Sequence, residues 1–102
     1  AVIKSKKVPY MKNALELAKA GIIPAGAYAN IDHIKCRAKI SPHVPEEMSD
    51  VMHDPQTSGG LLISMNQKEA EKFLKSIKKS LPDSCAIGVF SAKKDVDIIV
   101  ET

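Results

Sequence analysis

Asp54-Pro55-Gln56-Thr57-Ser58-Gly59-Gly60, followed at once by the apolar residues Leu61-Leu62-Ile63, is the most distinctive stretch of this sequence. Proline fixes the backbone angle φ, and the Asp, Thr and Ser side chains can bond to nearby main-chain N–H groups. The paired glycines permit positive φ and a close approach of other backbone. The stretch therefore predicts a tight polar turn that leads into a buried strand over 61–65.

Helices and strands alternate on both sides of this turn. Before it, the pattern predicts a short strand at Val2-Ile3 and a helix from about Pro9 to Ala20, with Gly21 just past its end. An irregular segment from Ile22 to Ile34 is expected next. A half-buried strand over 35–40 and a short helix over 46–52 then lead to the turn. Pro24 and Gly26 are interpreted as breakers within the irregular segment, where Asn30 could cap a short helical turn.

The clearest helix begins after Asn66, because Asn66-x-x-Glu69 has the form of a capping box. Its expected apolar stripe consists of Ala70, Phe73, Leu74, Ile77 and Leu81. A strand over 85–90, a turn over 92–95 and a closing strand over 96–100 follow, and the last two strands are close enough for a hairpin. We therefore expect one α+β domain over residues 1–102, with helices layered on a mixed sheet.

Composition limits the class of protein. The chain has 102 residues, of which 44% are hydrophobic and 26% charged, with a net charge of +3. This suits one ordinary globular domain. No apolar run approaches the roughly 18 residues of a membrane span, and the N-terminus does not resemble a signal peptide. The lysines are scattered without aromatic partners, so we expect neither a membrane nor a nucleic-acid partner.

Cys36 and Cys85 lie far apart and form no paired motif, which is typical of reduced thiols in a cytoplasmic protein. His33, His43 and His53 recur ten residues apart, whereas metal sites usually have closer ligand pairs. We therefore expect loop histidines and no metal ligands.

Thr57, Ser58, Gly59 and Gly60 are the candidate binding residues. Successive N–H groups in a glycine-containing turn can form an anion-binding nest, to which the two hydroxyls could add donors. The alternative is a turn that only positions the following strand. No Lys follows the glycines, so the Walker pattern is absent. Gln56 occupies the place of the first Gly of a nucleophile elbow, which disfavours Ser58 as a nucleophile.

The run His53-Asp54-Pro55-Gln56-Thr57-Ser58-Gly59-Gly60-Leu61-Leu62-Ile63 resembles a signature near the C-terminus of selenophosphate synthetases, the selenide, water dikinases. Two further stretches agree in order and spacing. The first comprises Ala14-Leu15-Glu16-Leu17-Ala18 with Gly21-Ile22-Ile23-Pro24-Ala25-Gly26, and the second comprises Ala86-Ile87-Gly88-Val89 with Ile98-Ile99-Val100. Where relatives often have G-T-x-R-N, only Gly26 and Asn30 are retained here, which weakens a phosphate-contacting role for that stretch.

The resemblance implies a layered α/β/α domain with a mixed sheet. This is the C-terminal domain of the superfamily that includes aminoimidazole ribonucleotide synthetase, truncated at its N-terminal end. The parent enzyme makes selenophosphate, AMP and phosphate from ATP, selenide and water, with ATP and Mg²⁺ as cofactors. The missing N-terminal domain carries the catalytic Cys or selenocysteine, the essential Lys and most of the metal-binding aspartates. Neither Cys36 nor Cys85 lies in that motif.

The resemblance therefore implies no catalytic and no metal residues in this chain. We expect the fragment to be inactive alone and to bind no cofactor, with the missing N-terminal domain as its partner and a homodimer as a further option. Two alternatives stay open. The chain could be a stand-alone anion- or nucleotide-binding regulatory module, or a structural or dimerisation domain of a related ATP-dependent synthetase.

Overall fold

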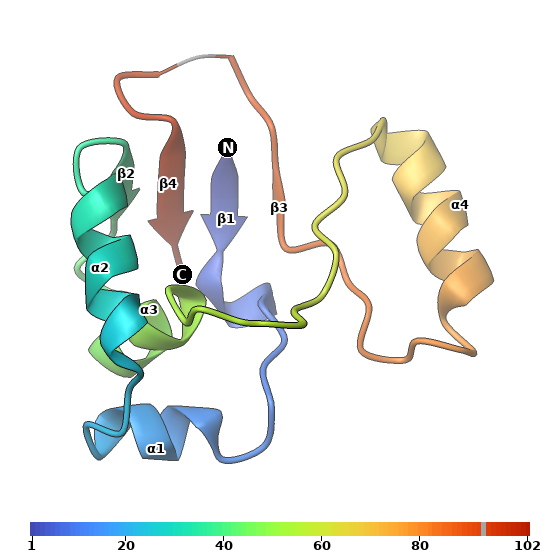
Figure 1. Cartoon of the computed structure of the whole chain (residues 1–102). Coiled ribbons are helices and arrows are strands. Elements are labelled where there is room, and N and C mark those ends of the chain that lie inside the picture. The colour runs from blue at the N-terminus through green and yellow to red at the C-terminus, as the bar shows by residue number, and fades with distance from the viewer. Residues whose placement is uncertain (93) are drawn as a thin grey trace.

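A four-stranded mixed sheet forms the centre of the computed structural model, which describes residues 1–92 and 94–102 (Figure 1). Its strands are β1 (Val2–Lys4), β2 (Ala38–Ile40), β3 (Gly88–Val89) and β4 (Ile98–Glu101), in the order β2-β4-β1-β3. Strands β1 and β2 run parallel to β4, whereas β3 runs antiparallel to β1. The predicted α+β class with a mixed sheet is confirmed. Lys93, within the predicted turn 92–95, lies outside the described residues.

The hairpin predicted for the last two strands is wrong, because the first strand of the chain lies between them. Val2 is opposite Val89 on one side of β1 and opposite Ile99 on the other. The N-terminal strand therefore joins the two C-terminal strands, an arrangement that local spacing along the sequence does not reveal.

The helices are α1 (Ala14–Lys19), α2 (Ala25–Ile34), α3 (Glu46–Met52) and α4 (Gln67–Ile77), and a short 3₁₀ turn, η1 (Ser5–Lys7), follows β1. The predicted bounds of α3 are confirmed. Helix α1 begins later than Pro9, because Asn13 has a left-handed conformation with φ of 67°. Gly21, just past its end, has φ of 77°, which suits the predicted glycine at that position.

The interpretation of residues 22–34 as irregular is wrong, because α2 occupies ten of them. Pro24 has an extended backbone and is the N-cap of α2, so it begins the helix instead of breaking one. A proline lacks only a main-chain N–H that the first turn of a helix leaves unbonded in any case.

The core lies between α3 and one face of the sheet. Val44, Met48 and Val100 are its buried members, and six half-buried residues pack against them: Ile3, Val8, Leu15, Ile40, Met52 and Ile98. In Figure 1, α1, α2 and α3 gather near β2 and β4, whereas α4 stands apart beyond β3. The radius of gyration is 14.4 Å, compared with about 13 Å for a compact domain of this length.

The predicted buried strand over 61–65 is wrong. These residues form no strand, and the exposed fractions of Leu61, Leu62 and Ile63 are 91%, 77% and 51%. The helix that follows is confirmed, with Asn66 Oδ1 accepting a hydrogen bond from the amide of Lys68 at 3.1 Å. However, α4 has no buried residue, so none of the described residues packs over its apolar stripe closely enough to bury it.

Candidate functional site

The first half of the distinctive motif is fixed to the helical layer through His53. This residue is the C-cap of α3, and only 8% of it is exposed. Its ring Nδ1 lies 2.7 Å from the carbonyl oxygen of Ser49. Its own carbonyl oxygen accepts a hydrogen bond of 2.8 Å from Nδ2 of Asn30 on α2. His53 therefore lies in the turn just past α3, as expected for a loop histidine, but it is buried and hydrogen-bonded at the helix end.

Pro55 is held against the start of α2. A Cβ atom built on Gly26 would lie 2.8 Å from Cγ of Pro55, closer than real carbon contacts allow. Gly26 is thus needed because the proline ring occupies the space of a side chain. Gly26 therefore lies against Pro55, and Asn30 is hydrogen-bonded to His53. Two segments that carry the family resemblance, the start of α2 and the motif, thus meet in space.

The second half of the motif contains the predicted binding residues Thr57, Ser58, Gly59 and Gly60, and all four are exposed. No other backbone approaches either glycine closely; a Cβ added at Gly59 would lie 2.5 Å from the side-chain atom Oε1 of Gln56, and a Cβ at Gly60 would meet no atom within 4 Å. Positive φ is not found at either glycine, since Gly21 is the only glycine of the described residues with that conformation. That part of the expectation is wrong, and anion binding by the loop stays a prediction.

A small pocket lies beside the motif, on the side of α1. Its volume is about 170 Å³, and its lining is apolar except for two aspartates: Ala14, Leu17, Ala18, Ile22, Ile23, Pro24, Asp50, Val51 and Asp54. Asp50 and Asp54 thus share a pocket with apolar walls, which the sequence pattern did not predict. Among the described residues, no group of three His, Cys, Asp or Glu side chains is placed to hold a metal ion.

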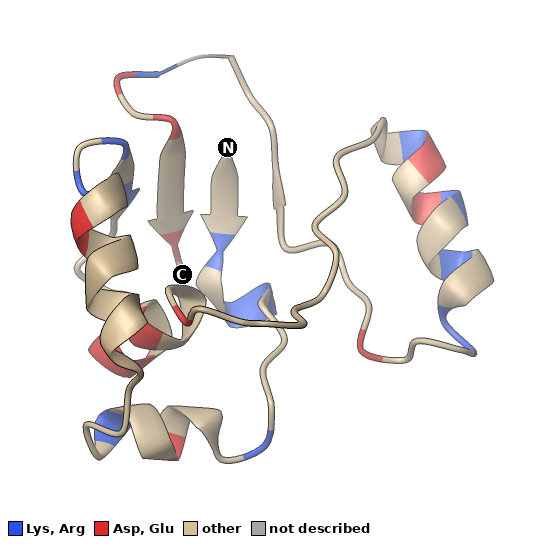
Figure 2. Cartoon of the chain, viewed as in Figure 1, with Lys and Arg blue, Asp and Glu red and all other residues tan. Residues whose placement is uncertain are grey.

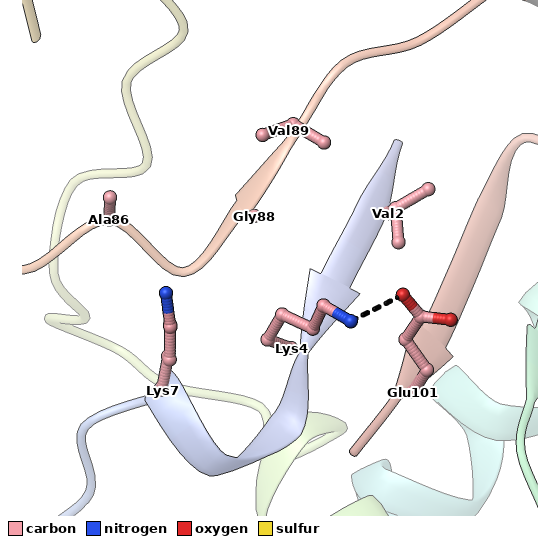
Figure 3. A pocket seen from close by; sticks show the side chains of 7 residues that line it. All are labelled: Val2, Lys4, Lys7, Ala86, Gly88, Val89 and Glu101. Atoms are coloured by element: carbon pink, nitrogen blue, oxygen red, sulfur yellow. Dashed lines mark ion pairs between the residues drawn. The ribbon is translucent and has the colours of Figure 1, made fainter. Parts of the chain in front are cut away.

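A larger pocket of about 420 Å³ lies between β1 and the segment around β3, and Figure 3 shows its lining: Val2, Lys4, Lys7, Ala86, Gly88, Val89 and Glu101. Lys4 Nζ and Glu101 Oε1 form an ion pair of 2.7 Å. The hydrogen bond from Lys4, together with the lysine's charge, lowers the pKa of Glu101 from its ordinary value. Lys4 and Lys7 were expected to be scattered surface charges, and no pattern in the sequence indicates this pocket, because its lining comes from both ends of the chain.

Both cysteines are exposed free thiols. Within the described residues, no helix is long and apolar enough to span a membrane.

Comparison with known proteins gives a consistent result. Selenide, water dikinase of Clostridium botulinum (strain Alaska E43) is 42% identical over 99 residues, which make up 97% of this chain and 29% of the relative. Selenide, water dikinase of Caldanaerobacter subterraneus is 38% identical over 94 residues, 91% of this chain and 27% of the relative. Selenide, water dikinase 2 of Peptoclostridium acidaminophilum is 50% identical over 68 residues, 67% of this chain and 19% of the relative.

No family model matches the chain, and no solved structure matches it. The detailed likeness to the aminoimidazole ribonucleotide synthetase fold therefore stays a prediction. The chain spans about 29% of the length of the first relatives that it matches, and those relatives share one name. The chain therefore belongs to the selenide, water dikinase family, as a C-terminal-type segment of it.

Proposed function

We propose that this chain is the C-terminal part of an enzyme that makes selenophosphate, AMP and phosphate from ATP, selenide and water. The identity of 42% across 97% of the chain carries the proposal, because the similarity is not confined to one motif. The contacts of Asn30 with His53 and of Gly26 with Pro55 support it, since they give the family-like motif a defined anchor.

The chain supplies no catalytic residue in this proposal. Phosphoryl transfer depends on cations that neutralise phosphate oxygens and on an aligned nucleophile. The described residues bring no group of three His, Cys, Asp or Glu side chains together, and Mg²⁺ is usually held by one or two carboxylates together with substrate phosphates. Mg²⁺ and most contacts to ATP belong to the rest of the enzyme. Thr57, Ser58, Gly59 and Gly60, exposed at the end of an anchored motif, donate hydrogen bonds to the nucleotide phosphates.

The partner that completes the site is the N-terminal part of the same enzyme. Leu61, Leu62 and Ile63 directly follow the proposed phosphate loop and are exposed by 91%, 77% and 51%. Figure 2 shows that the chain carries no charged residue from the loop to the start of α4. A contiguous exposed apolar stretch of this kind is typical of an interface. Its burial against the N-terminal part would hold the loop at the nucleotide.

A chimeric enzyme tests the proposal. The 102 residues replace the matching segment of the Clostridium botulinum relative, and selenide-dependent AMP formation is measured. We expect an active chimera and no turnover by the chain alone. Thr57→Val should raise the KM for ATP at least tenfold, because a hydrogen bond to a charged group contributes about 1.5–3 kcal/mol.

Ser80→Ala is the matched control, since Ser80 is also exposed but lies after α4, away from the loop. A folded but inactive chimera would contradict the proposed function. Selenide-dependent turnover by the chain alone that Asp54→Asn abolishes would contradict the proposed inactivity.

The second candidate function is a dimerisation domain, and the exposed apolar residues of 61–65 favour it. Sedimentation of the chain over a hundredfold range of concentration separates the two. A defined dimer that Leu62→Ser dissociates would favour dimerisation. A stand-alone binding module would instead show titratable ATP binding that Thr57→Val removes.

A further inference from the structure

The larger pocket lies on the face of the sheet opposite the core. Side chains along a strand alternate between the two faces. Ile3 packs with Val100 in the core, so its neighbours Val2 and Lys4 face the other way. The register then sets their partners on that second face, because Lys4 is opposite Glu101 and Val2 is opposite Val89. Three strands therefore contribute side chains to one cavity of about 420 Å³.

Lys7 supplies a second positive charge to this cavity. The ammonium group of Lys4 is bound to Glu101, but among the described residues no carboxylate lies within ion-pair distance of Lys7. Figure 3 shows the Lys7 side chain pointing toward Ala86, across the cavity. The carbonyl oxygen of Lys7 accepts a hydrogen bond from Cys85 Sγ at 3.0 Å, which fixes its backbone against the segment that leads into β3.

The charged and apolar residues that line the cavity indicate which class of ligand it could bind. Two lysines and one glutamate line the cavity, so the lining carries a net positive charge. The remaining walls are Val2, Ala86, Gly88 and Val89, which offer apolar contact. The volume lies within the range of about 300–1,000 Å³ that is usual for small-molecule sites. Lysine is a common partner of phosphate as a point charge, and a phosphate dianion gains more from the two ammonium groups than a single carboxylate does.

We propose that this cavity binds a phosphate monoester, with the phosphate at the ammonium group of Lys7 and the organic group against Val2 and Val89. Lys4, three residues before Lys7 on the same wall, adds a second positive charge, and Glu101 limits its attraction for the phosphate because it pairs with Lys4. The site is separate from the Thr57–Gly60 loop and does not depend on the proposed enzymatic function.

Titration of the 102-residue chain tests the proposal, with ¹H–¹⁵N spectra recorded at fixed ionic strength. The probes are phenyl phosphate, inorganic phosphate and benzoate. We expect phenyl phosphate to bind at least fivefold more tightly than either of the others, with shifts at the amides of Val2, Lys7 and Gly88. Lys7→Gln should weaken phenyl phosphate at least fivefold, and Glu101→Gln should tighten it about threefold by releasing Lys4.

Lys6→Gln is the matched control, because Lys6 is in the same 3₁₀ turn but does not line the cavity. It should change the affinity less than twofold. Equal losses in the Lys6 and Lys7 variants would overturn the proposal in favour of diffuse surface attraction. Benzoate binding as tightly as phenyl phosphate would overturn the phosphate assignment. Shifts confined to Thr57–Gly60 would place the site elsewhere and overturn it too.

Discussion

The side-chain amide of Asn30 donates a hydrogen bond of 2.8 Å to the main-chain carbonyl of His53, across 23 residues of sequence. Asn30 lies on α2, and His53 ends α3 at the point where the motif begins. The bond satisfies a part-buried carbonyl group beyond the end of a helix, where such groups lack a helical partner. It therefore fixes the direction in which the motif leaves the helical layer.

Asn30→Ala should lower the free energy of unfolding by about 1 kcal/mol, because it leaves the His53 carbonyl without its partner. Urea unfolding followed by circular dichroism measures this. His33→Ala is the control, since His33 is exposed on the same helix. A loss as large in the control as in Asn30→Ala would mean that the hydrogen bond contributes nothing specific.

Gly26→Ala should destabilise the chain by about 1–2 kcal/mol despite the better helix propensity of alanine. The added Cβ would lie 2.8 Å from Cγ of Pro55, and crowding of this kind typically costs about 1–3 kcal/mol. Pro55→Ala in the same chain should recover most of the loss, which a double-mutant cycle measures.

Gly60→Ala is the matched control for Gly26→Ala, because a Cβ at Gly60 would meet no atom within 4 Å. It should be neutral or stabilising by about 0.4–1 kcal/mol. A Gly26→Ala variant as stable as the Gly60 variant would show that the proline ring moves freely.

Gly88→Ala should separate β3 from β1, because its Cβ would collide with the carbonyl oxygen of Val2. The amide of Lys4 bonds to the carbonyl oxygen of Ile87 at 2.8 Å and should lose protection in hydrogen exchange. The amide of Ile99, bonded to the carbonyl oxygen of Ala1 at 2.9 Å, should keep its protection. Equal exchange at Lys4 in both proteins would contradict the close approach.

The pKa of Glu101 should rise in the Lys4→Gln variant, because the hydrogen bond and the charge of Lys4 lower it. A lowered pKa in the folded state means that the ion pair stabilises the fold above the ordinary carboxyl pKa. That contribution is lost as the pH falls through the lower, folded-state value. Carboxyl ¹³C shifts recorded against pH check this, and identical midpoints with and without Lys4 would contradict it.

Leu62→Ser should reduce the binding of a hydrophobic dye by the chain while leaving its unfolding midpoint nearly unchanged. Leu62 is 77% exposed, so its removal leaves no cavity in the core. Met48→Ala is the contrast, because Met48 is 5% exposed and its loss should cost about 2–5 kcal/mol. A comparable loss of stability in Leu62→Ser would mean that residues 61–65 are packed.

Local pattern was enough for elements whose signals lie within one turn or one face. The bounds of α3 and the Asn66 cap of α4 were predicted, because capping and helical periodicity depend only on residues a few positions apart. Helix α2 was missed because Pro24 and Gly26 have two opposite interpretations. Proline can break a helix or begin one, and a glycine in a helix can be present for the sake of a distant neighbour, here Pro55.

The sequence by itself determined the family, the mixed α+β class and the motif at residues 54–60, since these depend on residue identity and local spacing. The tertiary structure alone decided that β1 separates β3 from β4 and that Asn30 holds His53. It also placed Lys4, Lys7 and Glu101 around one cavity. Strand order and side-chain contacts depend on pairing between residues as many as 97 positions apart, as with Lys4 and Glu101. Residues 61–65 show where prediction from the sequence fails, because an apolar run becomes a strand only where another strand is free to pair with it.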